Sequence, residues 1–161
     1  MSSYDVHVAS FDELAGRTSY ALWRLRESVF VVEQECAYQE LDGRDVEPGT
    51  RHVWATVNGA DAGPDPEADP GAGDEPVGYL RLLDEGHHVR IGRVLVAKGH
   101  RGHGLSGTLM ETALRLVGDR ASVLDAQTPL AGWYSGYGYR RTGPDFLDDG
   151  ILHTPMRRPA G

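Results

Sequence analysis

Apolar and polar residues alternate, or recur at helical spacing, along the first third of the chain. Residues 4–8 alternate and predict a first strand. Ser10 and Glu13 have the spacing of a capping box, which predicts that a helix begins here and continues to about Glu33. One face of this helix is apolar, and its residues are Leu14, Leu22, Leu25, Val29 and Val32. After an irregular acidic segment, residues 51–57 alternate and predict a second strand.

The remaining pattern predicts a mixed α/β domain. Residues 77–83 and 89–96 are apolar enough for two strands, and the turn between them lies near Gly86. An amphipathic helix is predicted by the helical spacing of Leu105, Leu109, Ala113 and Leu116. The later elements are a short buried strand, a short helix and two weaker strands, at residues 122–126, 130–137, near Tyr139 and at 151–156. This order predicts one α/β domain over residues 1–161, with a largely antiparallel first half.

Composition separates one segment from the rest of this domain. Residues 60–76 contain six acidic residues, no basic ones, four prolines and three glycines, which is typical of a flexible surface insertion. The segment accounts for most of the net charge of −8, so the rest of the chain is near −2. The single cysteine, Cys36, excludes an internal disulfide and favours a reducing compartment. Because no export signal or membrane span is visible, we expect a cytoplasmic protein with no membrane partner.

Outside the insertion, opposite charges gather in two short stretches. Residues 33–47 hold six acidic side chains against one arginine, and residues 90–103 hold four cationic side chains and two histidines but no acid. A local basic stretch in an acidic protein suggests that it binds an anion. The stretch is too small for a nucleic-acid surface, and a pI near 5.3 argues in the same direction.

Three glycines lie at the junction of a predicted strand and a predicted helix, where Gly102, Gly104 and Gly107 form a G-x-G-x-x-G pattern. Backbone N–H groups at the start of a helix bind phosphate groups, and glycine lets them approach closely. A nicotinamide dinucleotide site is one interpretation, with Asp125 near the position of a ribose-binding acid. Only 36 residues follow Asp125, however, and hairpin-like strands precede the motif, so the topology disfavours that interpretation. A turn without a ligand is the other alternative.

Several separated motifs resemble a known family. Val94-x-Val96 followed by Arg101-Gly102-x-Gly104-x-Ser106 resembles the acyl-CoA signature of the GNAT N-acetyltransferases, with a serine where glycine or alanine is usual. The stretch "WYSGYGY" resembles the aromatic segment of the same family. The stretches "LRESVFVVEQECAYQELDGRD", "TRH", "IGRVLV", "AQTPLAGWY" and "FLDDGILHTPM" are similar to its ElaA-type branch. The resemblance covers essentially the whole chain outside the insertion.

The resemblance implies a fold and a cosubstrate. The fold is a single GNAT-type α/β domain whose mixed, mostly antiparallel sheet is splayed between strands 4 and 5 and flanked by helices. Acetyl-CoA is the implied cosubstrate, with its pantetheine arm along Val94, Leu95 and Val96. The residues implied at the pyrophosphate are Arg101, Gly102, His103, Gly104, Leu105, Ser106 and Gly107. Gln127 occupies the place of a family asparagine that contacts the cofactor.

The implied reaction is direct attack of a primary amine on the acetyl thioester. Presenting an alkylammonium of pKa ~10.4 as the neutral amine at pH 7 costs ~4.6 kcal/mol, so a base, a water relay or a desolvating pocket is needed. The candidates for the base are His52, Glu33 and Glu40, each of which also has a purely structural interpretation. The acidic stretch is expected to attract a cationic acceptor. Tyr134 is the candidate proton donor to the departing thiolate, and its alternative role is to pack among neighbouring aromatic rings.

Other function classes fit less well. No C-x-x-C or H-E-x-x-H spacing indicates a metal site, and Cys36 is interpreted as a small pocket or core residue. A GNAT-fold module that binds or senses acyl-CoA without turnover is the alternative to an enzyme. The identity of the amine acceptor and the assembly, monomer or homodimer, stay open.

Overall fold

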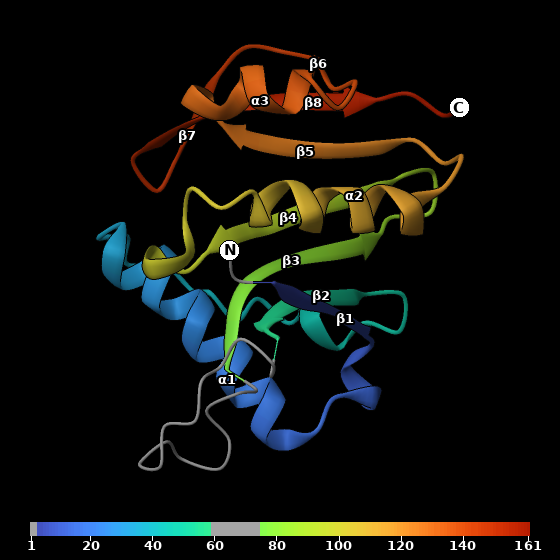
Figure 1. Cartoon of the computed structure of the whole chain (residues 1–161). Helices are drawn as coiled ribbons and strands as arrows, with labels where there is room; N and C mark the ends of the chain where they lie inside the picture. The colour runs from blue at the N-terminus through green and yellow to red at the C-terminus, as the bar shows by residue number, and fades with distance from the viewer. Residues whose placement is uncertain (1–2, 59–74) are drawn as a thin grey trace.

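One mixed sheet forms the body of the protein. The computed structural model describes residues 3–58 and 75–161. Within them the strand order is β1-β2-β3-β4-β5-β8-β6, and β7 pairs with β8 (Figure 1). Only β4 and β5 are parallel, so the predicted mixed, mostly antiparallel sheet is confirmed. The strands are β1 (Tyr4–Ala9), β2 (Arg51–Val57), β3 (Pro76–Asp84), β4 (Val89–Val96), β5 (Ser122–Gln127), β6 (Arg140–Arg141), β7 (Phe146–Asp148) and β8 (Ile151–Arg158).

The N-terminal helix is more broken than predicted. The capping box is present, with the Ser10 backbone N–H donating to Glu13 at 2.9 Å, but it opens only the 3-10 turn η1 (Phe11–Glu13). The α-helix α1 (Gly16–Arg26) begins after that turn and continues into a π-helical segment, η2 (Glu27–Glu33). The wider π-helical turns change the periodicity, and Val32, predicted on the apolar face, is 67% exposed.

The later helices follow the prediction closely. α2 (Leu105–Val117) places Leu105, Leu109 and Ala113 in the core, but the predicted fourth apolar position, Leu116, is 47% exposed, and Val117 is buried in its place. The short helix α3 (Ala131–Ser135) follows β5 through the 3-10 turn η6 (Thr128–Leu130).

Side chains that alternate along the strands divide the interior into two apolar clusters on opposite faces of the sheet. On one face, Leu80 of β3 and Leu124 of β5 pack with the buried residues of α2 and with Tyr134 of α3. On the other face, Tyr79 of β3 and Leu95 of β4 pack with Leu22 of α1. We call these sides the α2 face and the α1 face. Figure 1 shows β5, β8 and α3 at one end of the sheet, and β1 and β2 at the other.

Strands β4 and β5 separate after two paired positions. Their register is Val89 with Ser122 and Arg90 with Val123, whereas β4 continues to Val96. On its other side β4 contains an extra residue, because its register with β3 shifts between Tyr79 and Arg81. The predicted splay between strands 4 and 5 is therefore present.

A short hairpin at the C-terminal end was not predicted. β7 and β8 are joined by Asp149 and Gly150, whose φ angles of 48° and 79° are both positive. An Asp-Gly pair in a two-residue loop is a strong hairpin signal, so the sequence contained the information needed to find β7. The hairpin brings Phe146 opposite His153 in the β7–β8 ladder.

The predicted insertion over residues 60–76 lies mostly outside the described residues. Its last residue, Pro76, is the first residue of β3, so the insertion ends before the predicted boundary. In the described part of the chain, no helix is long and apolar enough to cross a membrane.

Candidate active site

A cavity of about 800 Å³ opens where β4 and β5 separate. It reaches both faces of the sheet, because its walls include residues of η2, β3, β4, α2, β5, α3 and the β7–β8 hairpin. Eight of the residues predicted to contact the cofactor line it: Val94, Leu95, Val96, Arg101, Gly104, Ser106, Gly107 and Gln127. Three others do not line it: Leu105 is buried in the core, and Gly102 and His103 are exposed but are not part of the wall.

On the α2 face, the glycine turn presents the start of α2 to the cavity. Gly104 is the residue before the first helical turn and has a φ of 78°, a conformation that favours glycine. A Cβ placed on Gly104 would meet no protein atom within 4 Å, so a side chain there would project into open space. Free N–H groups at a helix start bind anions, and this space is open to a phosphate group.

Arg101 in this turn is held at two points. Its Nε donates to the carbonyl oxygen of Val96 at 2.9 Å, and its guanidinium pairs with the carboxylate of Glu33, with 2.9 Å between Nη2 and Oε2. The hydrogen bonds from Arg101 lower the pKa of Glu33. Glu33 does not line the cavity.

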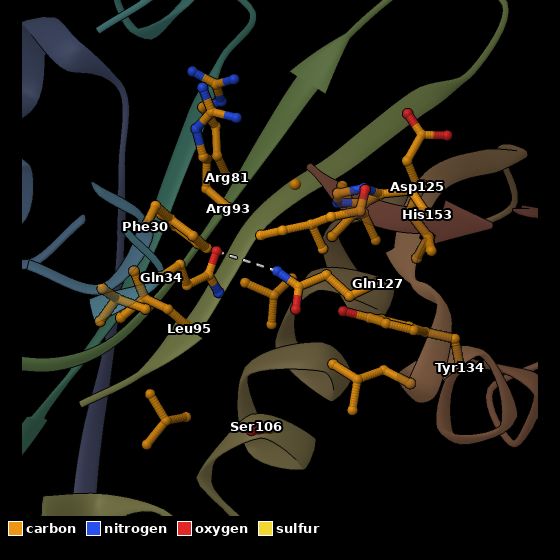
Figure 2. Close-up of a pocket in the computed structure, with 18 of the residues that line it drawn as sticks. Phe30, Gln34, Arg81, Arg93, Leu95, Ser106, Asp125, Gln127, Tyr134 and His153 are labelled. Carbon is orange, nitrogen blue, oxygen red and sulfur yellow. Dashed lines mark hydrogen bonds between the residues drawn. The ribbon is translucent and has the colours of Figure 1, made fainter. Parts of the chain in front are cut away.

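Tyr134 of α3 packs in the cluster on the α2 face and lines the cavity. Its side chain is 6% exposed, and its hydroxyl points into the cavity beside Gln127 (Figure 2). No hydrogen bond to this hydroxyl is found among the described residues. Burial, followed by a smaller effect of Tyr139, raises the pKa of Tyr134, so the hydroxyl keeps its proton.

On the α1 face, arginines and carboxylates form a compact network. Arg26 of α1 is fully buried and lies 2.6 Å from both Glu40 and Asp45. Arg93 pairs with Glu40 at 3.0 Å. Arg81 pairs with Asp45 at 3.1 Å. Glu40 and Asp45 are thus neutralised by buried arginines, which argues against the expectation that these two acids attract a cationic acceptor.

Arg81 and Arg93 also form one wall of the cavity, opposite Asp125 and His153 (Figure 2). Arg81 is 4% exposed, and its Nε has no hydrogen-bond partner in the described residues. Arg93 has a φ of 53°, unusual for a residue other than glycine, at the extra residue of β4.

None of the three predicted base candidates lines the cavity. His52 is completely buried: its Nε2 lies 3.0 Å from the carbonyl oxygen of Asp45, and its Nδ1 lies 2.6 Å from the hydroxyl of Tyr79. A carbonyl only accepts hydrogen bonds, so Nε2 carries the proton and Nδ1 accepts from Tyr79. Burial lowers the pKa of His52. Glu40 already accepts hydrogen bonds from Arg26, Arg93 and Tyr38.

Two polar residues that the sequence analysis did not propose for catalysis do line the cavity. Asp125 of β5 pairs with Arg90 at 3.2 Å. His153 of β8 is the direct partner of Gln127 in the β5–β8 ladder. Alternation along β5 and its pairing with β8 put Asp125, Gln127 and His153 on one face of the sheet. The sequence analysis could have found this group only if the pairing of the two strands had been known.

The single cysteine is part of the cavity wall. Cys36 is buried, lines the cavity, and its thiol lies 3.3 Å from the carbonyl oxygen of Asp149. This agrees with its interpretation as a small pocket residue. In the described part of the chain, no group of three or more His, Cys, Asp or Glu side chains is arranged to hold a metal ion.

Known proteins share this architecture. The family model of the acetyltransferase (GNAT) domain matches residues 71–159. The chain belongs to the GNAT acetyltransferase family. A UPF0039 protein of Mycobacterium tuberculosis is 44% identical to it over 91% of this chain and 88% of the relative. ElaA of Escherichia coli is 35% identical over 91% of this chain and 90% of ElaA, which supports the ElaA-type branch.

Solved structures agree with this assignment. An acyl-CoA N-acyltransferase from Pseudomonas aeruginosa superposes with a TM-score of 0.82 at 37% identity, covering 97% of this chain and 99% of that one. The structure of E. coli ElaA superposes with a TM-score of 0.81 at 31% identity, covering 97% and 99%. The predicted GNAT fold is confirmed. This GNAT protein is an acyltransferase, and its cosubstrate is an acyl-CoA. The open space at Gly104 and the unpaired length of β4 fit such a molecule.

Proposed function

We propose that this GNAT protein transfers the acetyl group of acetyl-CoA to a primary amine by direct attack of the amine nitrogen on the thioester carbon. The observation that carries the proposal is the two-sided cavity at the splay. Its α2 face offers a glycine turn and an open strand edge, and its α1 face offers polar side chains. A cosubstrate and an acceptor can therefore meet in it from opposite faces of the sheet.

The α2 face suits two parts of the cosubstrate, the pantetheine arm and the pyrophosphate. At Val94, Leu95 and Val96 the edge of β4 that faces away from β3 lies beyond its pairing with β5, and it can bind the amide groups of the pantetheine arm; the carbonyl oxygen of Val96 on this stretch accepts from Arg101. The N–H groups around Gly104 suit the pyrophosphate. Arg101 adds a positive charge at the same turn.

Tyr134 is the proposed hydrogen-bond donor to the sulfur as it leaves. With ordinary pKa values, full proton transfer from tyrosine to a thiolate would be uphill by only ~2 kcal/mol. Because burial raises the pKa of Tyr134 further, full transfer costs more than this. A hydrogen bond to the departing sulfur is therefore the favoured role, and it stabilises the negative charge without complete loss of the proton.

The geometry disfavours the predicted bases. Both ring nitrogens of His52 are engaged inside the protein. Glu33 is paired with Arg101, which lowers its pKa and makes it a weaker base. Neither lines the cavity.

An acceptor screen tests the proposal. Purified protein with acetyl-CoA would be given free amino acids, spermidine, tyramine, an aminoglycoside and peptides with a free N-terminus or a lysine. Release of free thiol gives the rate, and mass spectrometry identifies the acetylated product. We expect at least one primary amine to be acetylated faster than in a blank without enzyme. Binding of acetyl-CoA with no acetylated amine in any class would instead support a module that binds acyl-CoA without turnover.

A further inference from the structure

His153 has one ring nitrogen committed to the backbone. Its Nδ1 lies 2.8 Å from the carbonyl oxygen of Ile151, two residues earlier on β8. Because the carbonyl can only accept, Nδ1 must carry a proton. In the neutral ring the other nitrogen, Nε2, then has a free lone pair. No hydrogen bond to Nε2 is found among the described residues.

The ring is held without using that lone pair. Phe146 of β7 stacks on it, with 5.8 Å between the ring centroids and 22° between the planes. The stacking and the bond to Ile151 together limit rotation of the imidazole. A fixed ring with one free nitrogen is the arrangement that a general base requires.

His153 faces the acceptor side of the cavity. On β8 its neighbour Thr154 is buried, and on β5 Leu124 and Ala126 pack on the α2 face. His153 pairs with Gln127, so it shares the opposite, α1 face with that residue. Gln127 in turn donates a hydrogen bond to Gln34 of the α1 side at 3.4 Å, and Figure 2 shows this bond beside the hydroxyl of Tyr134.

We propose that Nε2 of His153 is the general base that removes a proton from the acceptor ammonium group. This inference rests on the proposed acetyl transfer. Unlike the carboxylates of Glu33 and Glu40, Nε2 has no cationic partner within residues 3–58 and 75–161 that would compete for its lone pair. Imidazole is also the side chain whose protonation changes most readily near neutral pH.

Transfer of one acetyl group removes two protons from the acceptor ammonium group. Nε2 takes one proton from the ammonium, and the freed nitrogen lone pair forms the C–N bond to the thioester carbon. The C–S bond breaks, and the sulfur leaves with its electron pair, hydrogen-bonded to Tyr134. The second proton that the nitrogen loses on becoming an amide neutralises the thiolate through solvent, while Tyr134 keeps its own proton. His153 then releases its proton to solvent, so one proton is released for each acetyl group transferred.

The test compares acceptors that do and do not need a base. His153→Gln and wild type would be assayed with the primary alkylamine that gives the highest rate in the acceptor screen, and with hydroxylamine, which is largely unprotonated at neutral pH. We expect the variant to lose about 10²-fold in kcat/KM with the alkylamine, the scale of general base catalysis, and only a few-fold with hydroxylamine after subtraction of the uncatalysed reaction. Equal losses with both, or no loss with the alkylamine, would overturn the assignment.

His7→Gln is a matched control. His7 also stacks on an aromatic ring, Trp54, and also bonds through one nitrogen, with 2.9 Å from Nε2 to Thr56 Oγ1, but it does not line the cavity. His7→Gln should leave the rates with the alkylamine and with hydroxylamine unchanged. Nitrogen-15 NMR of the histidine rings, assigned with His153→Gln, gives a readout that needs no acceptor. We expect a proton on Nδ1 of His153, and a neutral ring protonated on Nε2 would overturn the inference. If wild type acetylates no amine while its His153 ring is protonated on Nδ1, the proposed function fails, and the role of His153 fails only as its consequence.

Discussion

Glu33 and Arg101 form an ion pair that ties the end of η2 to the glycine turn, with 2.9 Å between Oε2 and Nη2. The pair is about 40% exposed on both sides, so it adds little to stability. Its carboxylate instead competes with any phosphate for the guanidinium. The sequence suggested Glu33 as a base because it is acidic and near the site, but its carboxylate is paired with Arg101 and does not line the cavity.

Glu33→Gln is therefore expected to leave kcat within about threefold of wild type and to maintain or tighten CoA binding. Arg101→Gln should weaken CoA binding by about tenfold, near 1.4 kcal/mol. Steady-state kinetics and calorimetric titration with CoA measure the two effects. Glu75→Gln, which breaks the exposed pair of Arg24 and Glu75 at 2.9 Å, is the control. A loss of 10²-fold or more in kcat for Glu33→Gln would restore Glu33 as a base.

Gly104→Val is expected to abolish the rise in melting temperature caused by CoA. Its side chain would occupy the space that a phosphate group needs, and the positive φ adds strain of about 1–2 kcal/mol. Gly86 has a φ of 82° and open space around its Cβ, but it does not line the cavity. Gly86→Val therefore introduces similar strain and should keep the CoA-induced shift. Differential scanning fluorimetry with and without CoA compares them, and an unchanged shift in Gly104→Val would contradict the anion site.

Tyr134→Phe keeps the ring and removes only the hydroxyl. Turnover should fall by about 10²-fold with little change in CoA affinity, because the lost hydrogen bond acts on the leaving sulfur. Tyr139→Phe is the contrasting variant, since the hydroxyl of Tyr139 lies 2.6 Å from Ser122 in the core. That change should lower stability by about 1 kcal/mol and leave turnover intact below the melting temperature. Equal turnover of Tyr134→Phe and wild type, with chemistry rate-limiting, would leave Tyr134 as a packing residue.

Local patterns predicted the elements that form the proposed cofactor-binding surface. A strand, a glycine turn and an amphipathic helix follow one another between Val89 and Val117, so one stretch of sequence contains most of that surface. The acceptor side depends on contacts that are distant in sequence. Arg26 of α1 meets Asp45, and Arg81 of β3 meets Asp42, across 19 and 39 residues of sequence, and no pattern along the chain shows these pairs.

His52 and His153 also show that contacts distant in sequence cannot be predicted from the sequence pattern. His52 was a reasonable base by residue type, but Tyr79 and Asp45 occupy both of its nitrogens in the fold. The sequence pattern does not single out His153, which lies on a weakly patterned strand, and the β7–β8 hairpin was not predicted. That hairpin supplies Phe146 and thereby fixes the ring. Side-chain chemistry could be read from the sequence, but the free lone pair could not.

Replacing residues 60–74 by a short Gly/Asn turn should change the free energy of unfolding by no more than about 1 kcal/mol. Their composition cannot bury enough apolar area to offset the entropy of ordering. Extending the deletion through Val77 should cost several kcal/mol, because Val77 is 8% exposed and packs in the core from β3. Urea denaturation compares the two deletions. A large loss from the shorter one, or loss of acetyl transfer, would show a role for the insertion.

Acid should weaken the network on the α1 face through Asp42. Burial alone would raise the pKa of Asp42, but hydrogen bonds from Arg81 and from the Arg44 backbone hold it at about 2. A carboxyl whose pKa is lower in the folded state stabilises the fold above its unfolded value near 3.9 and loses that effect as pH falls toward 2. We therefore expect the free energy of unfolding to fall between about pH 4 and pH 2, with Asp42 contributing on the order of 1–2 kcal/mol.

Asp42→Asn isolates this contribution. The amide cannot become charged, so at pH 7 the variant should be less stable than wild type by about that amount, and the difference should shrink as pH falls toward 2. Asp12→Asn is the control, because Asp12 is exposed and has no ion pair in the described residues. Urea denaturation at several pH values measures both. A stability difference between Asp42→Asn and wild type that stays constant from pH 7 to pH 2 would mean that the aspartate acts through the shape of its hydrogen bonds to Arg81 and not through its charge.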